Sequence, residues 1–231
     1  MGIRLQPQFY LLNLANPGQS NTCSQSRWRV VEAKTLSGPE SPISQKLIVL
    51  LLLALALAPP ARAGVTIHYE GTAASPDSVT KILAAVTTFA EKNKWRTEDA
   101  STAKGRLQRV IDEMDKDYEG RITGVVVRTT ANCEPLYFQF GDDLFMQDFV
   151  KTQFAGADLH IQIVQLLESL RPYFKQIDVY DEGDYWETHN KAVLQKHIAT
   201  VNSMIADIKK KNPLAKGPLR MKSGRIADVV E

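Results

Sequence analysis

A thiol, an imidazole and a pair of carboxylates stand in the middle of the chain, at Cys133, His160 and the adjacent Asp142 and Asp143. Such groups can form a nucleophilic set when a fold brings them together. The residues around Cys133 match no hydrolase signature, and these signatures do not transfer between families. The pattern therefore favours a buried, inert Cys133 and a His160 on a helix surface. A small hydrolase or other enzyme acting near the 141–143 turn is the alternative.

The two adjacent carboxylates have a plainer interpretation as well. Together with Glu134 and Asp148 they could converge at a sheet edge, where one carboxylate raises the pKa of another and permits acid–base chemistry. At a turn between a strand and a helix, however, Asp more often accepts a backbone hydrogen bond as a helix cap. We expect Asp142 or Asp143 to act as a cap while the other faces water.

Residues 178–184 form an acidic, glycine-bearing turn of the kind that supplies oxygen ligands to calcium. Aligned with the EF-hand loop, this segment has Tyr180 and His189 at two positions that require an acid. We therefore expect a solvated turn, no metal and no other cofactor. The residues that would ligate a metal are Asp178, Asp181, Glu182 and Asp184.

Tyr185 and Trp186 follow this turn and are the two residues with which a partner surface would be built. Exposed, they would anchor another protein, because Tyr and Trp contribute strongly to interface energies. Buried, Trp186 would fasten the last helix to the sheet.

The apolar run at residues 47–58 is too short to span a membrane but has the length of a signal-peptide core. Ala61 and Ala63 then supply the small residues that a signal peptidase recognises, which predicts a segment 47–63 cleaved before Gly64. Residues 1–46 are expected to be a disordered or mis-assigned extension. The sequence thus predicts a periplasmic or secreted protein that meets a membrane only through its signal segment, with a cytoplasmic protein as the alternative.

Charge is distributed unevenly. The whole chain carries a net charge of +2, but residues 1–63 hold six bases and two acids, so the remaining 168 residues have a net charge of −2. Seven bases and two acids follow from Lys209 onward, which leaves 64–208 at −7. An acidic body argues against nucleic acid and makes a protein the expected partner. Cys133 is the only cysteine after residue 63, so no internal disulfide is expected.

Hydrophobic periodicity predicts one α+β domain at 64–211, followed by a disordered basic tail at 212–231. The expected elements are a strand at 65–70, a helix at 76–93, a loop at 96–107, strands at 107–114, 121–128 and 135–140, a short helix at 145–150, a helix at 159–170, a strand at 177–179 and a helix at 188–211. Consecutive strands favour a two-layer sandwich, in which a mixed or antiparallel sheet carries about three helices on one face. A ferredoxin-like arrangement is one way to build it.

These patterns predict a small exported binding protein, inhibitor-like or immunity-like in the sense that its acidic surface occupies a basic target. No coherent catalytic set stands out, so catalysis is the less favoured hypothesis.

Overall fold

Alternating residue types build the first strand, β1 (Thr66–Ala73), whose Ile67, Tyr69 and Ala73 enter the core. The structure, a computed structural model, describes residues 64–230. The other strands are β2 (Arg96–Asp99), β3 (Thr102–Leu107), β4 (Val110–Ile111), β5 (Met114–Asp115), β6 (Tyr118–Arg128), β7 (Leu136–Phe140), β8 (Phe145–Lys151), β9 (Phe174–Asp181), β10 (Leu219–Arg220) and β11 (Ile226–Ala227). The helices are α2 (Pro76–Lys92), α3 (Ala157–Leu170), η1 (Arg171–Tyr173), α4 (Tyr185–Thr188) and α5 (Lys191–Lys211).

The strands pair antiparallel throughout the described residues. β1 lies between β8 and β9, while β6 pairs with β2, β3 and β7. β7 and β8 are consecutive and lie side by side, which joins the two groups of strands. If β2–β6, which lie between α2 and β7, are set aside, the elements β1, α2, β7, β8, α3 and β9 have the β-α-β-β-α-β order of a ferredoxin-like unit. The predicted α+β sandwich with an antiparallel sheet is confirmed.

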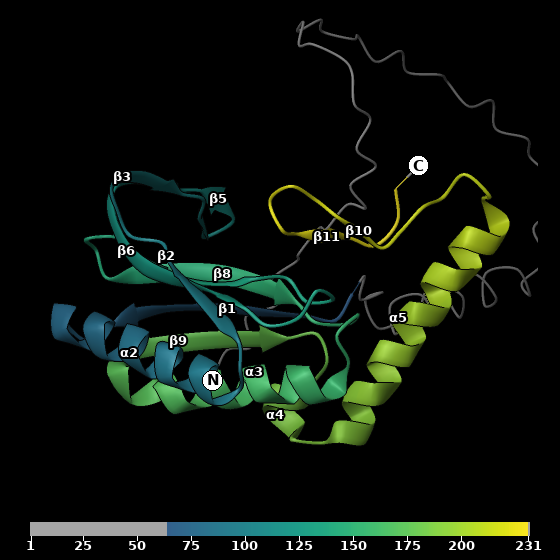
Figure 1. Cartoon of the computed structure of the whole chain (residues 1–231), viewed down its shortest axis with the longest axis horizontal. Helices are drawn as coiled ribbons and strands as arrows, with labels where there is room; N and C mark the ends of the chain where they lie inside the picture. Colours follow the sequence, from purple (N-terminus) through teal and green to yellow (C-terminus); the bar gives the residue numbers. More distant parts are fainter. Residues whose placement is uncertain (1–63, 231) are drawn as a thin grey trace, which may run out of the picture. The chain divides into compact units, whose positions relative to one another are not determined.

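Helices α2 and α3 lie on one side of the strands (Figure 1). α2 begins where the sequence predicts, because the Ser75 hydroxyl accepts a hydrogen bond from the Ser78 amide at 3.1 Å and Pro76 occupies the first turn. Its apolar stripe meets that of α3 and the inner side of the sheet in one core. Ile82, Val86, Phe138, Ile163 and Leu167 are fully buried there.

On the other side of the sheet, residues 102–121 form a projecting ribbon, here called the arm (Figure 1). β3 pairs with the first half of β6 from Thr102 to Leu107, and the short β4 and β5 close the end. The arm begins where the valines of β6 leave the core. Residues 125–127 are buried, whereas most residues of β3 are exposed.

Helix α5 packs against the rest of the fold through only part of its length. Leu194, Val201 and Ile205 are buried with Val65 in a second, smaller cluster, while Met204 and Ile208 of the same helix are exposed. The apolar stripe of α5 is therefore longer than the surface that covers it.

In place of the predicted disordered tail, the last residues fold back as a C-terminal hairpin, defined here as 219–227. Leu219 pairs with Ala227 and Arg220 with Ile226. Charge fixes this hairpin to the body. Lys151 forms an ion pair with Asp228 at 2.9 Å, and Arg225 forms ion pairs with two acids of the body. Composition alone predicted disorder because the segment is poor in apolar residues, but partly buried ion pairs hold it to the body.

The segment after the 141–144 turn is strand β8, so the short helix predicted at 145–150 is wrong. Phe145 and Phe149 lie on the outer side of the sheet, and Met146 and Val150 on the core side. Because β8 has large apolar residues on both of its sides, its sequence lacks the alternation of apolar and polar residues that identifies a strand. The predicted loop at 96–107 likewise contains β2 and β3, whose exposed, polar residues pair through their backbones. The strand predicted at 107–114 is instead mostly the turn-rich end of the arm.

Candidate functional site

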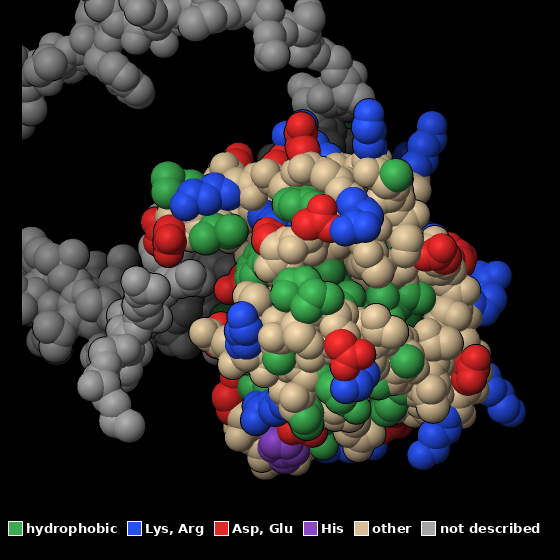
Figure 2. Space-filling model, turned by 90° about the vertical axis from the view of Figure 1, so that its left-hand side faces the viewer, with side chains coloured by type: hydrophobic (Ala, Val, Ile, Leu, Met, Phe, Trp, Pro, Cys, Tyr) green, Lys and Arg blue, Asp and Glu red, His purple; other side chains and the backbone are tan. Residues whose placement is uncertain are grey.

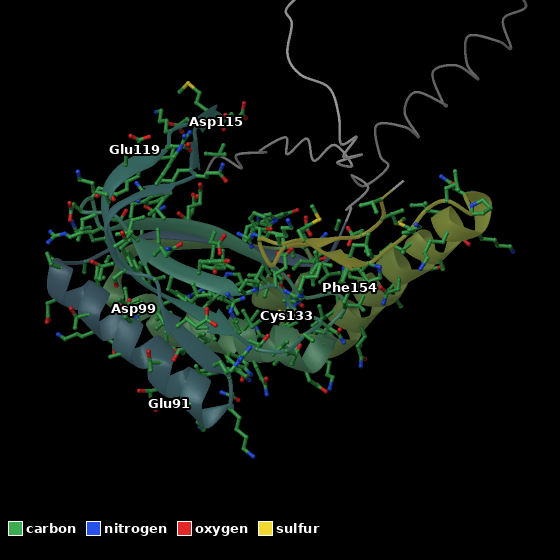
Figure 3. All side chains as sticks on the ribbon, turned by 45° about the horizontal axis from the view of Figure 1, so that its top comes forward. Glu91, Asp99, Asp115, Glu119, Cys133 and Phe154 are labelled. Carbon is green, nitrogen blue, oxygen red and sulfur yellow. The ribbon has the colours of Figure 1, made fainter. Side chains whose placement is uncertain are left out.

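The end of the arm combines exposed apolar and acidic side chains. We call residues 110–115 the tip. Val110 and Met114 are 54% and 53% exposed, and the acids Asp112, Glu113 and Asp115 are exposed around them. On the end of the molecule shown in Figure 2, hydrophobic side chains lie at the surface among acidic and basic ones. Figure 3 shows Asp115 and Glu119 on the arm, well separated from Cys133 in the body.

The tip turns tightly at Asp112 and Glu113, whose φ angles are 51° and 64°. Two successive residues with positive φ are characteristic of a two-residue hairpin, and this conformation is unfavourable for residues other than Gly, Asn and Asp. Strained backbone of this kind is often found at recognition sites. The chain has no glycine here to relieve the strain at Glu113.

Arg109 fixes the base of the tip and is only 4% exposed. Its guanidinium donates to both carboxylate oxygens of Asp143, at 2.5 and 3.2 Å, and to the Phe145 carbonyl at 2.7 Å. It also stacks on the rings of Tyr118 and Phe145, 4.7 and 5.1 Å from their centroids. A planar fork held by a carboxylate, a carbonyl and two rings has little freedom to move.

Gln147 of β8 makes a second set of hydrogen bonds to the tip. Its side-chain amide donates to the Val110 carbonyl at 2.8 Å, and its side-chain oxygen accepts from the Val110 amide at 2.7 Å. The same amide group also donates to Glu70 of β1. The tip is therefore bonded to both β8 and β1. Val110 and Met114 are thus presented beside exposed acids on a fixed support.

The residues that could have formed a catalytic set do not contact one another, and each has a different partner. Asp143 bonds Arg109, and Asp142 forms an exposed ion pair with Arg121 at 2.9 Å. Asp143 also accepts the Phe145 amide, so it caps a turn that leads into a strand, not a helix. Cys133 is buried, its thiol directed to the Lys151 carbonyl at 3.7 Å, and burial raises the pKa of that thiol to about 11. Among the described contacts, no hydrogen bond joins the Cys133 thiol to a histidine or a carboxylate.

His160 is fully buried, which corrects the expectation of a helix-surface side chain. One ring nitrogen lies 2.8 Å from the Thr152 hydroxyl and the other 2.9 Å from Asp181. Asp181 further accepts the amides of Gly183, Tyr185 and Trp186. Burial alone would raise the pKa of Asp181, but the bond from His160 and these amides hold it below its ordinary value. Thr152, His160 and Asp181 resemble a catalytic triad in their order, but all three are shielded from solvent. We therefore assign them a structural role.

Tyr185 and Trp186 are half-buried and pack against the main core, so they do not form an open patch. Tyr185 meets the edge of the His160 ring, and the Arg171 guanidinium lies 4.5 Å from the Trp186 ring centroid. Both aromatics thus fasten the short helix α4 to the fold.

The four acids proposed as metal ligands face different partners. Asp178 lies exposed and accepts from Gln176 at 2.6 Å, and Asp181 belongs to the His160 network. Glu182 accepts the Thr66 amide at 2.9 Å, whereas Asp184 pairs with His197 at 2.9 Å. Within residues 64–230, no three His, Cys or acidic side chains are grouped so that they could hold a metal ion.

A buried polar cluster lies beneath the C-terminal hairpin. Arg225 pairs with Asp148 and Glu134, and it donates to the Phe149 carbonyl. Asp148 also accepts the amide of Tyr137 at 3.2 Å and the hydroxyl of Tyr69 at 3.3 Å. Burial raises the pKa of Asp148 although Arg225 lowers it in part, and burial also raises the pKa of Tyr69. Of the four acids that could have converged, Glu134 and Asp148 meet at Arg225, whereas Asp142 and Asp143 pair with Arg121 and Arg109 instead.

Sequence reasoning did not identify the tip as a site. The sequence does contain a short hairpin pattern at this place. Asp112 and Glu113 stand between the apolar residues 110–111 and Met114. No protein-family model, curated protein or solved structure matches this chain. Among residues 64–230, no helix has the length and apolar character needed to cross a membrane.

Proposed function

We propose that this chain is an exported, soluble binding protein that presents its tip to a protein partner, in the manner of an inhibitor or an immunity protein. The observation that carries the proposal is the exposure of Val110 and Met114 on a support fixed by the buried Arg109. Large apolar side chains are costly to expose on an isolated protein, and they provide the central contacts of interfaces.

Charge supports a basic partner. Asp112, Glu113 and Asp115 surround the apolar pair, and the sequence from 64 to 208 has a net charge of −7. Complementary charge accelerates encounter and excludes acidic competitors. The partner should therefore present an apolar hollow with Lys or Arg at its rim.

Site-specific photo-crosslinking tests this function. A photoreactive amino acid replaces Met114 in one sample and Tyr180, an exposed residue on β9, in the control. The proposal predicts one dominant protein adduct from position 114 and not from position 180. Excess unlabelled wild-type protein should suppress the adduct, whereas a V110D/M114D variant should not. Equal adducts from both positions, or none from 114, would reject the tip as the binding site.

The export part of the proposal relies on the run at 47–58 and on Ala61 and Ala63, all of which lie outside the described residues. N-terminal sequencing of the protein from fractionated cells tests it. A chain that begins at Gly64 in the exported fraction supports export. A cytosolic chain that retains 47–58 contradicts it without affecting the tip.

A further inference from the structure

A second group of exposed apolar side chains lies near the C-terminal end of the chain. Five large apolar residues from the end of α5 to the hairpin are exposed, led by Leu214 at 76%: Met204, Ile208, Leu214, Leu219 and Met221. Together with Val110, Met114 and Tyr180, these are all the exposed large hydrophobic residues of 64–230.

Lysines are interspersed among these five residues. From 208 to 227 the sequence contains seven Lys or Arg and no acid. Five of the seven are exposed lysines, namely Lys209, Lys210, Lys211, Lys216 and Lys222. We call the five apolar residues and five lysines the basic face; along α5, Met204, Ile208 and Lys211 recur at helical spacing, and Lys209 donates to the Gly217 carbonyl at 2.9 Å.

The two arginines of this stretch bond the hairpin to the body. Arg220 donates to the backbone carbonyls of Ala131 and Cys133, and Arg225 bonds Asp148 and Glu134. Leu219 and Met221, on either side of Arg220, are 41% and 48% exposed. These exposed apolar side chains therefore lie on a hairpin that is attached to the rest of the fold.

We infer that the basic face binds the surface of an anionic lipid bilayer. Apolar side chains that can enter the headgroup region, alternating with lysines that can meet lipid phosphates, are the two features that interfacial binding needs. The acidic tip of a second copy is a poorer occupant. Its six residues cannot cover a surface that extends from Met204 on α5 to Lys222 in the hairpin. Nucleic acid would use the lysines but leave five apolar side chains without a partner.

Vesicle binding by the full-length protein tests this inference. Vesicles of phosphatidylcholine with about 30% phosphatidylglycerol are compared with phosphatidylcholine alone. The test variant is K209E/K210E/K211E. The matched control is K92E/K94E/K175E, which makes the same charge change at three exposed lysines elsewhere on the body. Residues 1–63 are present in every sample, so their contribution is common to all. A tryptophan placed at Leu214 reports on the basic face through the blue shift and the quenching by brominated lipid that exceed those of the wild type, whose three tryptophans give the background.

The expected result is that anionic vesicles bind the wild type and the control alike, and that K209E/K210E/K211E binds about a hundredfold more weakly, at roughly fivefold for each lysine. L214W should be quenched only by anionic vesicles, and less so as salt increases. Equal binding by the test and control variants, or an unquenched L214W, would overturn the inference. Salt-sensitive self-association that needs no vesicles, or displacement of the protein by duplex DNA at equal phosphate concentration, would assign the basic face to a second copy or to nucleic acid instead.

Discussion

Replacing Arg109 by alanine removes the group that holds the tip against the sheet. The guanidinium makes two bonds to Asp143, one to the Phe145 carbonyl and two ring contacts. The neighbouring pair Arg121–Asp142 provides a control on the same turn, because both of its side chains are largely exposed. R109A and R121A thus remove the same kind of side chain from two adjacent acids in different surroundings.

The cost of R109A follows from these contacts. Removing the Arg109 donor leaves the Phe145 carbonyl with only the 3.5 Å bond from the Gly141 amide and costs about 0.5–1.5 kcal/mol. Asp143 is 47% exposed, so its ion pair is screened and adds only about 0.2–1 kcal/mol. The two ring contacts add about 0.5–1 kcal/mol each. The parts overlap, and we expect a loss of about 2–4 kcal/mol for R109A, against less than about 1 kcal/mol for R121A.

Two measurements check this expectation. Urea denaturation gives the free energy of unfolding of each variant, and amide hydrogen exchange reports whether the Val110 amide remains bonded to Gln147. R109A should accelerate exchange at Val110 and weaken binding to the partner found by crosslinking, while R121A should do neither. Equal stability of R109A and R121A, with Val110 still protected, would refute the view that Arg109 fixes the tip.

Three further predictions concern buried groups. Iodoacetamide should modify Cys133 slowly in the native protein at pH 8 and rapidly in urea, because its thiol is buried with a pKa of about 11; rapid native labelling that depends on His160 would instead support a working nucleophile. Since the folded-state pKa of Asp181 is lowered, its contribution to stability should be present above its ordinary pKa and lost as the pH falls through the folded value. D181N should flatten that acid-side loss in urea titrations, and an unchanged pH profile would contradict the assignment. Since burial raises the pKa of Tyr69, its contribution should be lost as the pH rises above its ordinary value of 10.0. Absorbance at alkaline pH should show the same phenol titration in Y69F as in the wild type until the protein unfolds, and early loss of a phenol in Y69F would argue against this environment.

The three long helices α2, α3 and α5 were predictable because each carries its own local signals. Ser75 and Pro76 mark the start of α2, the apolar stripe of α3 ends before Pro172, and a run of lysines ends α5. Strand β8 was not predictable in the same way. Phe145 and Phe149 on the outer side and Met146 and Val150 on the inner side are all apolar, so the alternation that identifies a strand is missing.

The site depended on contacts between residues distant in sequence. Arg109 meets Asp143 across 34 residues, and His160 meets Asp181 across 21. Local patterns place such residues on elements but do not pair them. The folded tail illustrates the same limit, because composition predicted disorder while Arg225 finds Glu134 across 91 residues. The sequence shows that Val110 and Met114 are apolar, but their exposure follows from their position at the end of the arm and could not be predicted from local patterns.

The most direct test of the central claim is the affinity of the crosslinked partner, measured by titration calorimetry, for the wild type, V110D/M114D and D112K/E113K/D115K. The structure predicts that both tip variants bind at least about tenfold more weakly, since each loses a central part of the interface. K92E/K94E/K175E, altered away from the tip, should bind as the wild type does. Unchanged affinity in both tip variants would contradict the proposal that this protein binds its partner through the arm.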